Sequence, residues 1–253
     1  MIDGLESCRD AARSRTRSTI QSGEENITMP ILATEKVTKC FGEDAARVTA
    51  VREVDLQIAP GDFVAIVGPS GSGKSTLLHL LGLVEQPTSG RILFEGEDTS
   101  RFSDRRLSEL RRRRIGFVFQ KINLLPTLRA IENVSLPLLL DGVTRQEAEQ
   151  RAEAALERVD MTHRTSHLPA AMSGGEQQRV AIARAIVSDP GLIVADEPTG
   201  SLDSTNAQVV IRLLQQLNGD GRTIVMVTHD ATVAAATRRV LHFRDGRIES
   251  VRS

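Results

Sequence analysis

The segment Gly68–Thr76 constrains the fold of this chain more than any other part of the sequence. It reads Gly-Pro-Ser-Gly-Ser-Gly-Lys-Ser-Thr, which matches the pattern of a phosphate-binding loop. The apolar run Phe63–Val67 before it predicts a buried strand, and Leu77 and Leu78 after it belong to a predicted helix. Because such a loop needs a strand on one side and a helix N-terminus on the other, the sequence predicts an α/β fold.

The residue types in this loop suit a phosphate chain. Glycines let backbone N–H groups turn inward around phosphate oxygens, because no Cβ atom stands in the way. Lys74 can reach the β- and γ-phosphates, and the Ser75 hydroxyl is a hard oxygen ligand for Mg²⁺. We therefore predict phosphate contacts along the whole loop, from Gly68, Pro69, Ser70, Gly71, Ser72, Gly73, Lys74, Ser75 and Thr76.

Two acidic residues follow a second strand that is predicted to be buried on both faces. The strand is the apolar run Leu192–Ala195, and Asp196 and Glu197 stand at its carboxyl end, where ligands of an open α/β sheet bind. Adjacent residues of an extended chain point in different directions. Asp196 is therefore predicted to hold Mg²⁺, and Glu197 to orient or deprotonate an attacking water.

A third segment, Met172–Arg179, offers a separate anion site. Ser173, Gly174 and Gly175 stand at the start of a predicted helix, where a hydroxyl and several free amides point outward. The spacing alone leaves open whether this helix start reaches a phosphate chain bound by the same subunit.

The rest of the chain alternates short apolar runs with longer helical patterns, which is typical of an α/β domain. The predicted strands are Ile31–Thr38, Val48–Ile58, Asp62–Val67, Gly90–Phe94, Ile115–Phe119, Gly191–Ala195, Thr223–Thr228, Val240–Phe243 and Arg247–Ser250. The predicted helices are Gly73–Gly82, Ser103–Arg112, Ala130–Leu140, Arg145–Val159, Gly175–Val187, Ser204–Leu217 and Asp230–Arg238. We predict a helical subdomain, about residues 121–187, inserted in the α/β core of a domain that spans residues 30–253.

Composition narrows the remaining function classes. The chain has 32 Lys+Arg and 33 Asp+Glu, and this formal net charge of −1 argues against a general nucleic-acid binder. No segment approaches the roughly 20 consecutive apolar residues of a membrane-spanning helix. Two cysteines form no disulfide framework, so a reducing compartment such as the cytoplasm fits best.

The first 29 residues differ in composition from the rest of the chain. Between Asp3 and Glu25 the sequence carries four arginines and five acids with few large apolar residues, so it can bury little surface. We predict that residues 1–29 form a disordered N-terminal extension. Because the patterned sequence begins directly at Met29, that residue is an alternative start of translation.

Taken together, the motifs between Ile31 and Ser250 resemble those of the ATP-binding cassette (ABC) ATPases. The matching segments are Gly68–Thr76 as Walker A, Gln120 as the Q-loop glutamine, Ser173–Gln177 as the signature, Asp196-Glu197 as Walker B with its glutamate, Ser201–Asp203 as the D-loop and His229 as the switch histidine. The resemblance implies a P-loop NTPase fold of the ABC type, with an antiparallel β subdomain and an inserted α-helical subdomain. It also implies ATP hydrolysis with Mg²⁺.

The resemblance further implies a role for each matched residue. Glu197, His229 and Gln120 would be catalytic, and Ser75, Gln120 and Asp196 would hold Mg²⁺. Phe41 stands where the family usually has an aromatic residue stacked on adenine, and it keeps the ring while lacking the hydroxyl of tyrosine. In a head-to-tail homodimer each ATP would lie between the Walker A loop of one subunit and a surface of the other subunit formed by Ser173, Gly174, Gly175, Gln177 and Asp203.

The segments around Gln120, including Asn123–Pro126 and Glu132–Val134, resemble one branch of the family. That branch holds the ATPase subunits of lipoprotein-releasing, macrolide-efflux and cell-division complexes, which pair with separate integral-membrane permease subunits. It implies a peripheral location on the cytoplasmic side of the cell membrane, and no nucleic-acid partner. The alternative is a soluble ABC ATPase acting on ribosomes or nucleic acid, although such proteins usually carry two cassettes or large insertions. The sequence does not indicate the transported substrate.

Two further segments have more than one interpretation. The run Arg101–Arg114, with seven arginines and two acids, fits a solvated helix face, a surface near acidic lipid headgroups or a nucleic-acid patch, and we favour the first. The apolar run Leu136–Leu140 fits equally a groove that receives a helix of a membrane subunit and the core of the helical subdomain.

Overall fold

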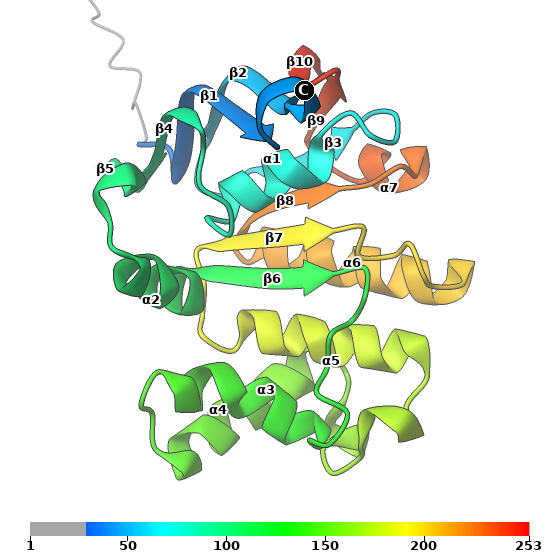
Figure 1. Ribbon diagram of the computed structural model, residues 1–253. Coiled ribbons are helices and arrows are strands. Elements are labelled where there is room, and N and C mark those ends of the chain that lie inside the picture. Colours follow the sequence, from blue (N-terminus) through cyan, green and yellow to red (C-terminus); the bar gives the residue numbers. More distant parts are fainter. Residues whose placement is uncertain (1–28, 253) are drawn as a thin grey trace, which may run out of the picture.

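A mostly parallel, six-stranded sheet lies at the centre of the computed structural model, which describes residues 29–252 (Figure 1). The predicted disordered extension lies outside the described residues except for Met29. The strand order is β10-β9-β3-β8-β7-β6. The strands are β3 (Phe63–Val67), β6 (Ile115–Phe119), β7 (Leu192–Asp196), β8 (Thr223–Val227), β9 (Arg239–Arg244) and β10 (Arg247–Arg252). Only β10 runs antiparallel to its neighbour, so the carboxyl ends of the other five strands meet at one edge.

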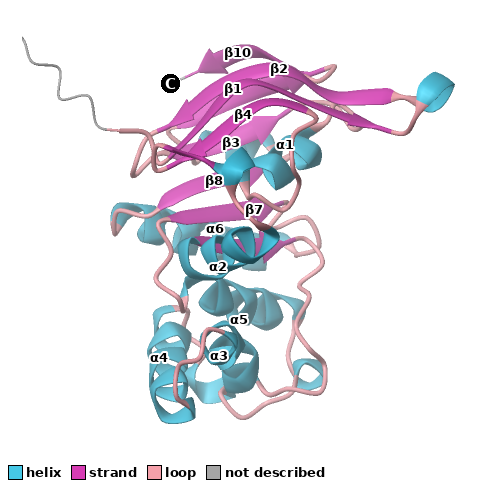
Figure 2. Cartoon of the chain, turned by 60° about the vertical axis from the view of Figure 1, so that its left-hand side comes forward, coloured by secondary structure: helices cyan, strands magenta, loops and turns pink. Residues whose placement is uncertain are grey.

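A second, antiparallel sheet has the order β2-β1-β4-β5. Its strands are β1 (Leu32–Phe41), β2 (Val48–Ile58), β4 (Ser89–Phe94) and β5 (Glu97–Asp98). Figure 2 shows it above the end of the molecule where β3 and α1 lie. Alternate residues of β1 and β2, such as Leu32 and Ile58, are fully buried and face the parallel sheet.

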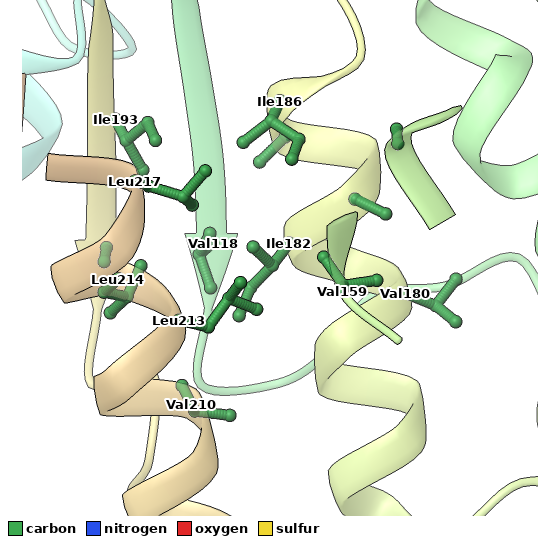
Figure 3. Close-up of a cluster of buried hydrophobic side chains, with 14 of the residues drawn as sticks. Val118, Val159, Val180, Ile182, Ile186, Ile193, Val210, Leu213, Leu214 and Leu217 are labelled. Carbon is green, nitrogen blue, oxygen red and sulfur yellow. The ribbon is translucent and has the colours of Figure 1, made fainter. Parts of the chain in front are cut away.

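Helices cover both faces of the parallel sheet. On one face, Val64 and Ile66 of β3 pack with α1 (Lys74–Leu81), α2 (Asp104–Arg114) and the antiparallel sheet. On the other face, Ala65 packs in a cluster that includes α5 (Gly174–Ile186), α6 (Ser204–Gly219) and α7 (Ala231–Ala235). Figure 3 shows part of this second cluster, in which Ile182 of α5 and Leu214 of α6 lie near Val118 and Ile193.

Between β6 and β7 the chain is helical. Helices α3 (Ala130–Leu140) and α4 (Arg145–Arg158) pack on α5 and on each other, and they form the lower part of the molecule in Figures 1 and 2. Short 3₁₀ turns complete the described chain at Asp44–Ala46, Thr99–Arg101, Thr162–Arg164 and Pro169–Ala171. None of the helices between residues 29 and 252 combines the length and the apolar character needed to cross a bilayer.

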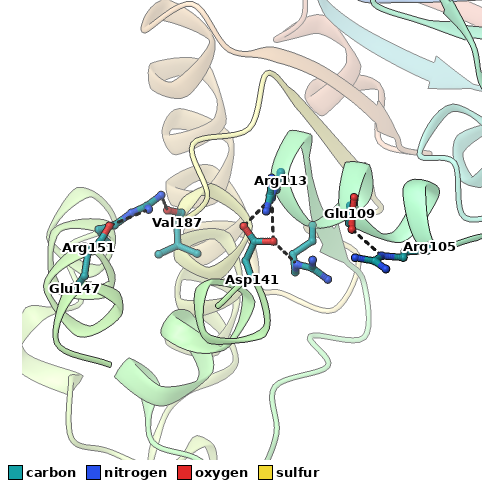
Figure 4. Close-up of polar contacts among 8 residues, drawn as sticks. Arg105, Glu109, Arg113, Asp141, Glu147, Arg151 and Val187 are labelled. Carbon is teal, nitrogen blue, oxygen red and sulfur yellow. Dashed lines mark hydrogen bonds and ion pairs between the residues drawn. The ribbon is translucent and has the colours of Figure 1, made fainter. Parts of the chain in front are cut away.

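Ion pairs tie this helical part to α2. Arg112 Nε and Arg113 Nε donate to the Asp141 carboxylate over 2.8 and 2.7 Å (Figure 4). Burial alone would raise the pKa of Asp141, but the two arginines lower it below its ordinary value. Arg105 pairs with Glu109, and Arg114 pairs with Glu95. Much of the arginine run is therefore neutralised within the chain, in line with the solvated-face interpretation.

Several element boundaries differ from the predicted ones. Helix α7 ends at Ala235 rather than Arg238, because the Thr237 hydroxyl donates to the Ala234 and Arg239 carbonyls and turns the chain into β9. Strand β5 was not predicted, since a two-residue strand of acids carries no apolar pattern. Strand β1 continues past Thr38 to Phe41 through register shifts.

Removal of a core side chain should be costly where packing is complete. We expect Leu214→Ala, at a fully buried position, to lower the free energy of unfolding by about 2–5 kcal/mol. Leu140 is 67% exposed, and Leu140→Ala should change the free energy of unfolding by less than about 0.5 kcal/mol. Urea unfolding of the two variants measures this difference, and equal losses would contradict the described core.

Candidate active site

The backbone of Gly68–Thr76 lies in close contact with two neighbouring strands. A Cβ atom on Gly68 would stand 1.9 Å from the Phe243 carbonyl oxygen in β9, and one on Gly73 would stand 2.0 Å from the Ala50 carbonyl oxygen in β2. Gly73 also has a φ of +99°, which favours glycine. The loop can therefore take this path only with glycine at both positions.

The turn between β9 and β10 braces the same loop. Gly246 N–H donates to the Ser72 carbonyl over 3.0 Å, and Arg52 N–H of β2 donates to the Gly246 carbonyl over 2.8 Å. The loop is thus held by strands from both sheets before it opens α1.

Polar groups of the loop point inward with few partners of their own. Lys74 is 5% exposed, and its Nζ donates to the Pro69 carbonyl over 2.8 Å. The Ser72 hydroxyl is buried without a hydrogen-bond partner among the described residues. Between residues 29 and 252 no acid pairs with the Lys74 ammonium, and both this ammonium and the Ser72 hydroxyl fit a phosphate chain, which would satisfy them. The residues present therefore suit a nucleotide.

Ser75 and Asp196 come together from different elements. Ser75 lies in the first turn of α1, and its Oγ is 3.3 Å from Asp196 Oδ1 at the end of β7. Burial raises the pKa of Asp196, whereas the nearby His79 opposes this rise. A hydroxyl and a carboxylate side by side beside a phosphate loop suit Mg²⁺, which prefers oxygen ligands and uses few from the protein.

Glu197 and His229 form the shortest polar contact of this edge. His229 follows β8, and its Nε2 lies 2.6 Å from Glu197 Oε1. Glu197 N–H donates to the Val227 carbonyl over 3.0 Å, so the backbones of the two segments are also joined. Glu197 has a φ of +46°, a strained conformation for a residue with a side chain, of the kind found at functional sites.

Gln120 reaches the same place from the end of β6. A Cβ atom on Gly200 would stand 2.8 Å from Gln120 Nε2 and 3.3 Å from Glu197 Oε2, so both side chains lie against this glycine. Gln120 itself is exposed. The structure thus brings together the loop at Lys74, Asp196, Glu197, His229 and Gln120.

Phe41 lies at the end of β1 and is 43% exposed. It pairs with Val48 of β2, two residues before Ala50, whose carbonyl touches the loop at Gly73. The ring is 5.1 Å from Lys39 Nζ, a cation–π distance. The half-exposed ring thus lies on the strand next to β2, which touches the loop.

The Ser173 segment lies away from the loop of its own chain. In Figure 1, β7 and β6 lie between α1 and α5. Ser173 caps α5 through a capping box with Glu176, and both Ser173 and Gly174 are exposed. Gly175 packs closely on Asn206, since a Cβ atom on Gly175 would stand 2.2 Å from Asn206 Oδ1. The Gln177 carboxamide donates inside the chain, to the Pro169 and Met172 carbonyls.

Asp203 lies beside this helix start as the N-cap of α6. Its carboxylate accepts from the Asn206 backbone N–H over 2.9 Å and from Asn206 Nδ2 over 2.6 Å. These hydrogen bonds lower the pKa of Asp203. Ser173, Gly174 and Asp203 are exposed, and they lie beside Gly175 and Asn206 on a surface separate from the Lys74 loop.

Comparisons with known proteins decide the family. A family model described as "ABC transporter" matches residues 51–200. The chain belongs to the ABC transporter family. An uncharacterized ABC transporter ATP-binding protein of Thermotoga maritima is 48% identical over 215 residues, which cover 85% of this chain and 92% of that protein.

Two further similarities extend this result. The macrolide export ATP-binding/permease protein MacB of Marinobacter nauticus is 48% identical over 219 residues, covering 87% of this chain but only 34% of MacB, so the chain spans about a third of that relative. A dimeric post-hydrolysis structure of the ATP-binding cassette MJ0796, bound to ADP and Pi, has a TM-score of 0.81 and 40% identity, and covers 88% of this chain and 98% of its own. The predicted P-loop ABC fold and the predicted ABC-type ATPase are confirmed.

Two residues at these sites were not predicted from the sequence. Glu176 was not assigned a function, although the spacing Ser-x-x-Glu is the signature of a capping box and could have revealed it. Glu176 also accepts from Arg164 Nε over 2.8 Å. His79 lies on α1 and opposes the rise in the pKa of Asp196. No sequence signal marks it, because the contact depends on the packing of α1 against β7.

Glu176 should make folding stability depend on pH. The Ser173 backbone N–H and the Arg164 guanidinium lower its pKa from 4.5 to about 2. The carboxylate therefore stabilises the fold fully above pH 4.5, and this contribution disappears as the pH falls through about 2. We expect Glu176→Gln to lower the free energy of unfolding by about 1–3 kcal/mol at pH 7, and by less at pH 3.

Urea unfolding at both pH values measures this change. Glu153→Gln, at an exposed position of α4, is the matched control and should change stability by less than about 0.5 kcal/mol at each pH. A loss in Glu176→Gln that is the same at both pH values would contradict the prediction.

Proposed function

We propose that this ABC ATPase acts as a Mg²⁺-dependent homodimer on the cytoplasmic side of the membrane, where ATP hydrolysis drives a separate integral-membrane permease subunit in export or in transmission of force. One observation supports this proposal above all. At the carboxyl edge of the parallel sheet lie the Lys74 loop, Asp196, Glu197, His229 and Gln120, while Ser173 faces away from it. The relatives reported above are transporter proteins, which supports this class over action on ribosomes or nucleic acid.

The assignment of roles follows from the contacts. The loop amides and Lys74 would bind the phosphates, and Phe41 would stack on adenine. Ser75, Asp196 and Gln120 would hold Mg²⁺, which would neutralise part of the negative charge of the phosphates. Glu197 would take the proton of the water that attacks the γ-phosphorus, as the bond to the ADP oxygen breaks and phosphate leaves. His229, whose Nε2 lies 2.6 Å from Glu197 Oε1, would orient that carboxylate and contact the γ-phosphate.

The dimer would complete the site. Ser173, Gly174, Gly175, Gln177 and Asp203 lie near an exposed helix start or its cap, and a second subunit arranged head to tail would present them to the ATP on this loop. The dimeric state described for MJ0796 supports this arrangement. ATP would hold the closed dimer better than ADP, because ADP lacks the phosphate gripped from both sides.

A groove between α2, α3, α5 and β6 is the proposed contact for the permease. It has a volume of about 390 Å³ and is lined by apolar side chains that include Phe117, Leu136 and Leu140. Leu140 is 67% and Val84 is 51% exposed at its rim. The name of MacB joins an ATP-binding part to a permease, and the Thermotoga maritima relative, 92% of which is matched, is named as an ATP-binding protein alone. The first name supports a permease partner, and the second supports a partner that is a separate subunit.

Substitution of the proposed base tests the enzymatic part. We expect Glu197→Gln to lower ATP turnover by at least about a hundredfold and to accumulate an ATP-bound dimer in gel filtration, because binding persists without proton transfer. Lys74→Ala should weaken nucleotide binding and form no such dimer. Glu157→Gln, exposed on α4, should behave as the unsubstituted chain. Full turnover in Glu197→Gln would place the base elsewhere, and full activity as a monomer would contradict the shared site.

Affinity purification from membranes in mild detergent tests the partner. We expect a protein with membrane-spanning segments to co-purify with the tagged chain, and Leu140→Gln to lose most of it while keeping its own ATPase rate, because an apolar contact is replaced by an amide. Val251→Gln, which changes a 48% exposed residue of β10, is the control and should retain the partner. Recovery with ribosomes or nucleic acid would support the alternative class.

A further inference from the structure

The loop that carries Gln120 is held by side chains of other segments. Four of its backbone carbonyls accept such hydrogen bonds. The Phe119 carbonyl accepts from Gln178 Nε2 over 3.3 Å, and the Gln120 carbonyl accepts from the Ser201 hydroxyl over 3.3 Å. The Ile122 and Asn123 carbonyls accept from the two terminal nitrogens of Arg184 over 3.2 and 2.7 Å. Gln178 and Arg184, both on α5, therefore contact the two ends of the segment Phe119–Asn123.

Gln178 joins this loop to the one that carries Glu197. Its side chain is 1% exposed, and the same Nε2 that reaches Phe119 donates to the Pro198 carbonyl over 2.8 Å. Pro198 directly follows Glu197 in the sequence. Because both partners are carbonyl oxygens, only the NH₂ end of the carboxamide can face them. One side chain thus fixes the backbone next to Gln120 and next to Glu197.

Arg184 holds the other end of the Gln120 loop through two hydrogen bonds. It makes no ion pair among the described residues, and its charge is offset only by the two loop carbonyls. Burial lowers the pKa of Arg184. Asn123, one of its partners, has a φ of +51°, a conformation that needs support from its surroundings. Arg184 also lines the groove proposed for the permease, together with Leu140.

We propose that Gln178 and Arg184 are positioning residues for ATP hydrolysis, which hold the segment Phe119–Asn123 so that the Gln120 side chain stays beside Glu197. This inference rests on the proposed roles of Gln120 and Glu197. Neither residue touches the nucleotide. Both act through the loop, and loss of either lets Gln120 drift from the position that the reaction needs. A displacement of about 1 Å in such a group can cost on the order of a hundredfold in rate.

The chain offers matched controls for both residues. Asn218 is a buried carboxamide whose Nδ2 bridges the Gly61 and Arg222 carbonyls over 2.9 and 2.8 Å, far from the site at the other edge of the sheet. Arg151 donates to the Val187 carbonyl at the end of α5 over 3.1 Å (Figure 4). Substitutions at Asn218 and Arg151 remove the same kinds of hydrogen bond without touching the Gln120 loop.

The experiment compares kcat, nucleotide affinity and thermal stability. We expect Gln178→Met and Arg184→Met to lower kcat about tenfold, with the Kd of a fluorescent ATP analogue changed less than about twofold. Arg184→Lys, which retains a charged donor, should recover part of the lost rate. Asn218→Leu and Arg151→Met should lose comparable thermal stability while keeping kcat. Equal kcat losses in the controls, or no loss in Gln178→Met and Arg184→Met, would overturn the inference.

A double-substitution cycle separates this inference from the proposed function. If Gln178 acts through Gln120, Gln120→Ala combined with Gln178→Met should be no slower than Gln120→Ala alone. Fully additive losses would overturn the positioning role while leaving the proposed function intact. An unchanged kcat in Gln120→Ala would show instead that the role proposed for Gln120 is wrong, and the inference would fall with it.

Discussion

Close contact between the phosphate-binding loop and two strands is the constraint on which the rest of the structure depends. The Gly68 and Gly73 backbones stand against carbonyls of β9 and β2, at distances that exclude any side chain. The antiparallel sheet must therefore lie over the end of the parallel sheet, with β2 beside the loop. In consequence Phe41, on the strand next to β2, lies near the loop although 26 residues separate it from Gly68 in the sequence.

The parallel sheet assembles the rest of the site. Strands β6, β7 and β8 are neighbours and run in the same direction, so the residues that follow them meet at one edge. Gln120, Asp196-Glu197 and His229 come from these three strand ends, and Ser75 comes from the helix that follows a fourth strand. The strained backbone of Glu197 and its hydrogen bond to the Val227 carbonyl belong to this assembly, because they hold the carboxylate toward His229. Close packing of buried apolar side chains on both sheet faces supplies the rigidity that such placement needs.

The sequence predicted well those features whose causes are local. The phosphate-binding loop, the apolar strands β6 and β8 and the helix α3 are recognisable from spacing and periodicity over a few residues. The predicted end of α7 was wrong because the Thr237 hydroxyl donates to backbone carbonyls and terminates the helix. The apolar pattern carries no sign of these bonds. Contacts between residues far apart in the sequence could not be predicted either. Arg112 and Arg113 are separated from Asp141 by the strand β6 and the whole of α3. The bonds from Gln178 to Phe119 and Pro198 exist only once α5 has packed on β6 and β7.

Helix α5 is the element on which the two halves of the proposed cycle converge. Its N-terminus carries the exposed cap residue Ser173, which would face the nucleotide of a second subunit, and Gly175 packs on Asn206 in the first turn of α6. One turn further on, Gln178 grips the segments that hold Gln120 and Glu197 of its own site, and Arg184 lies both on the Gln120 loop and in the groove beside Leu140. A helix is stiff along its axis, because each turn is hydrogen-bonded to the next. A small shift of α5 would therefore move the cap, the Gln120 loop and the groove together. Under the proposed function, closure of a second subunit, alignment for hydrolysis and engagement of a membrane partner would then be one mechanical event.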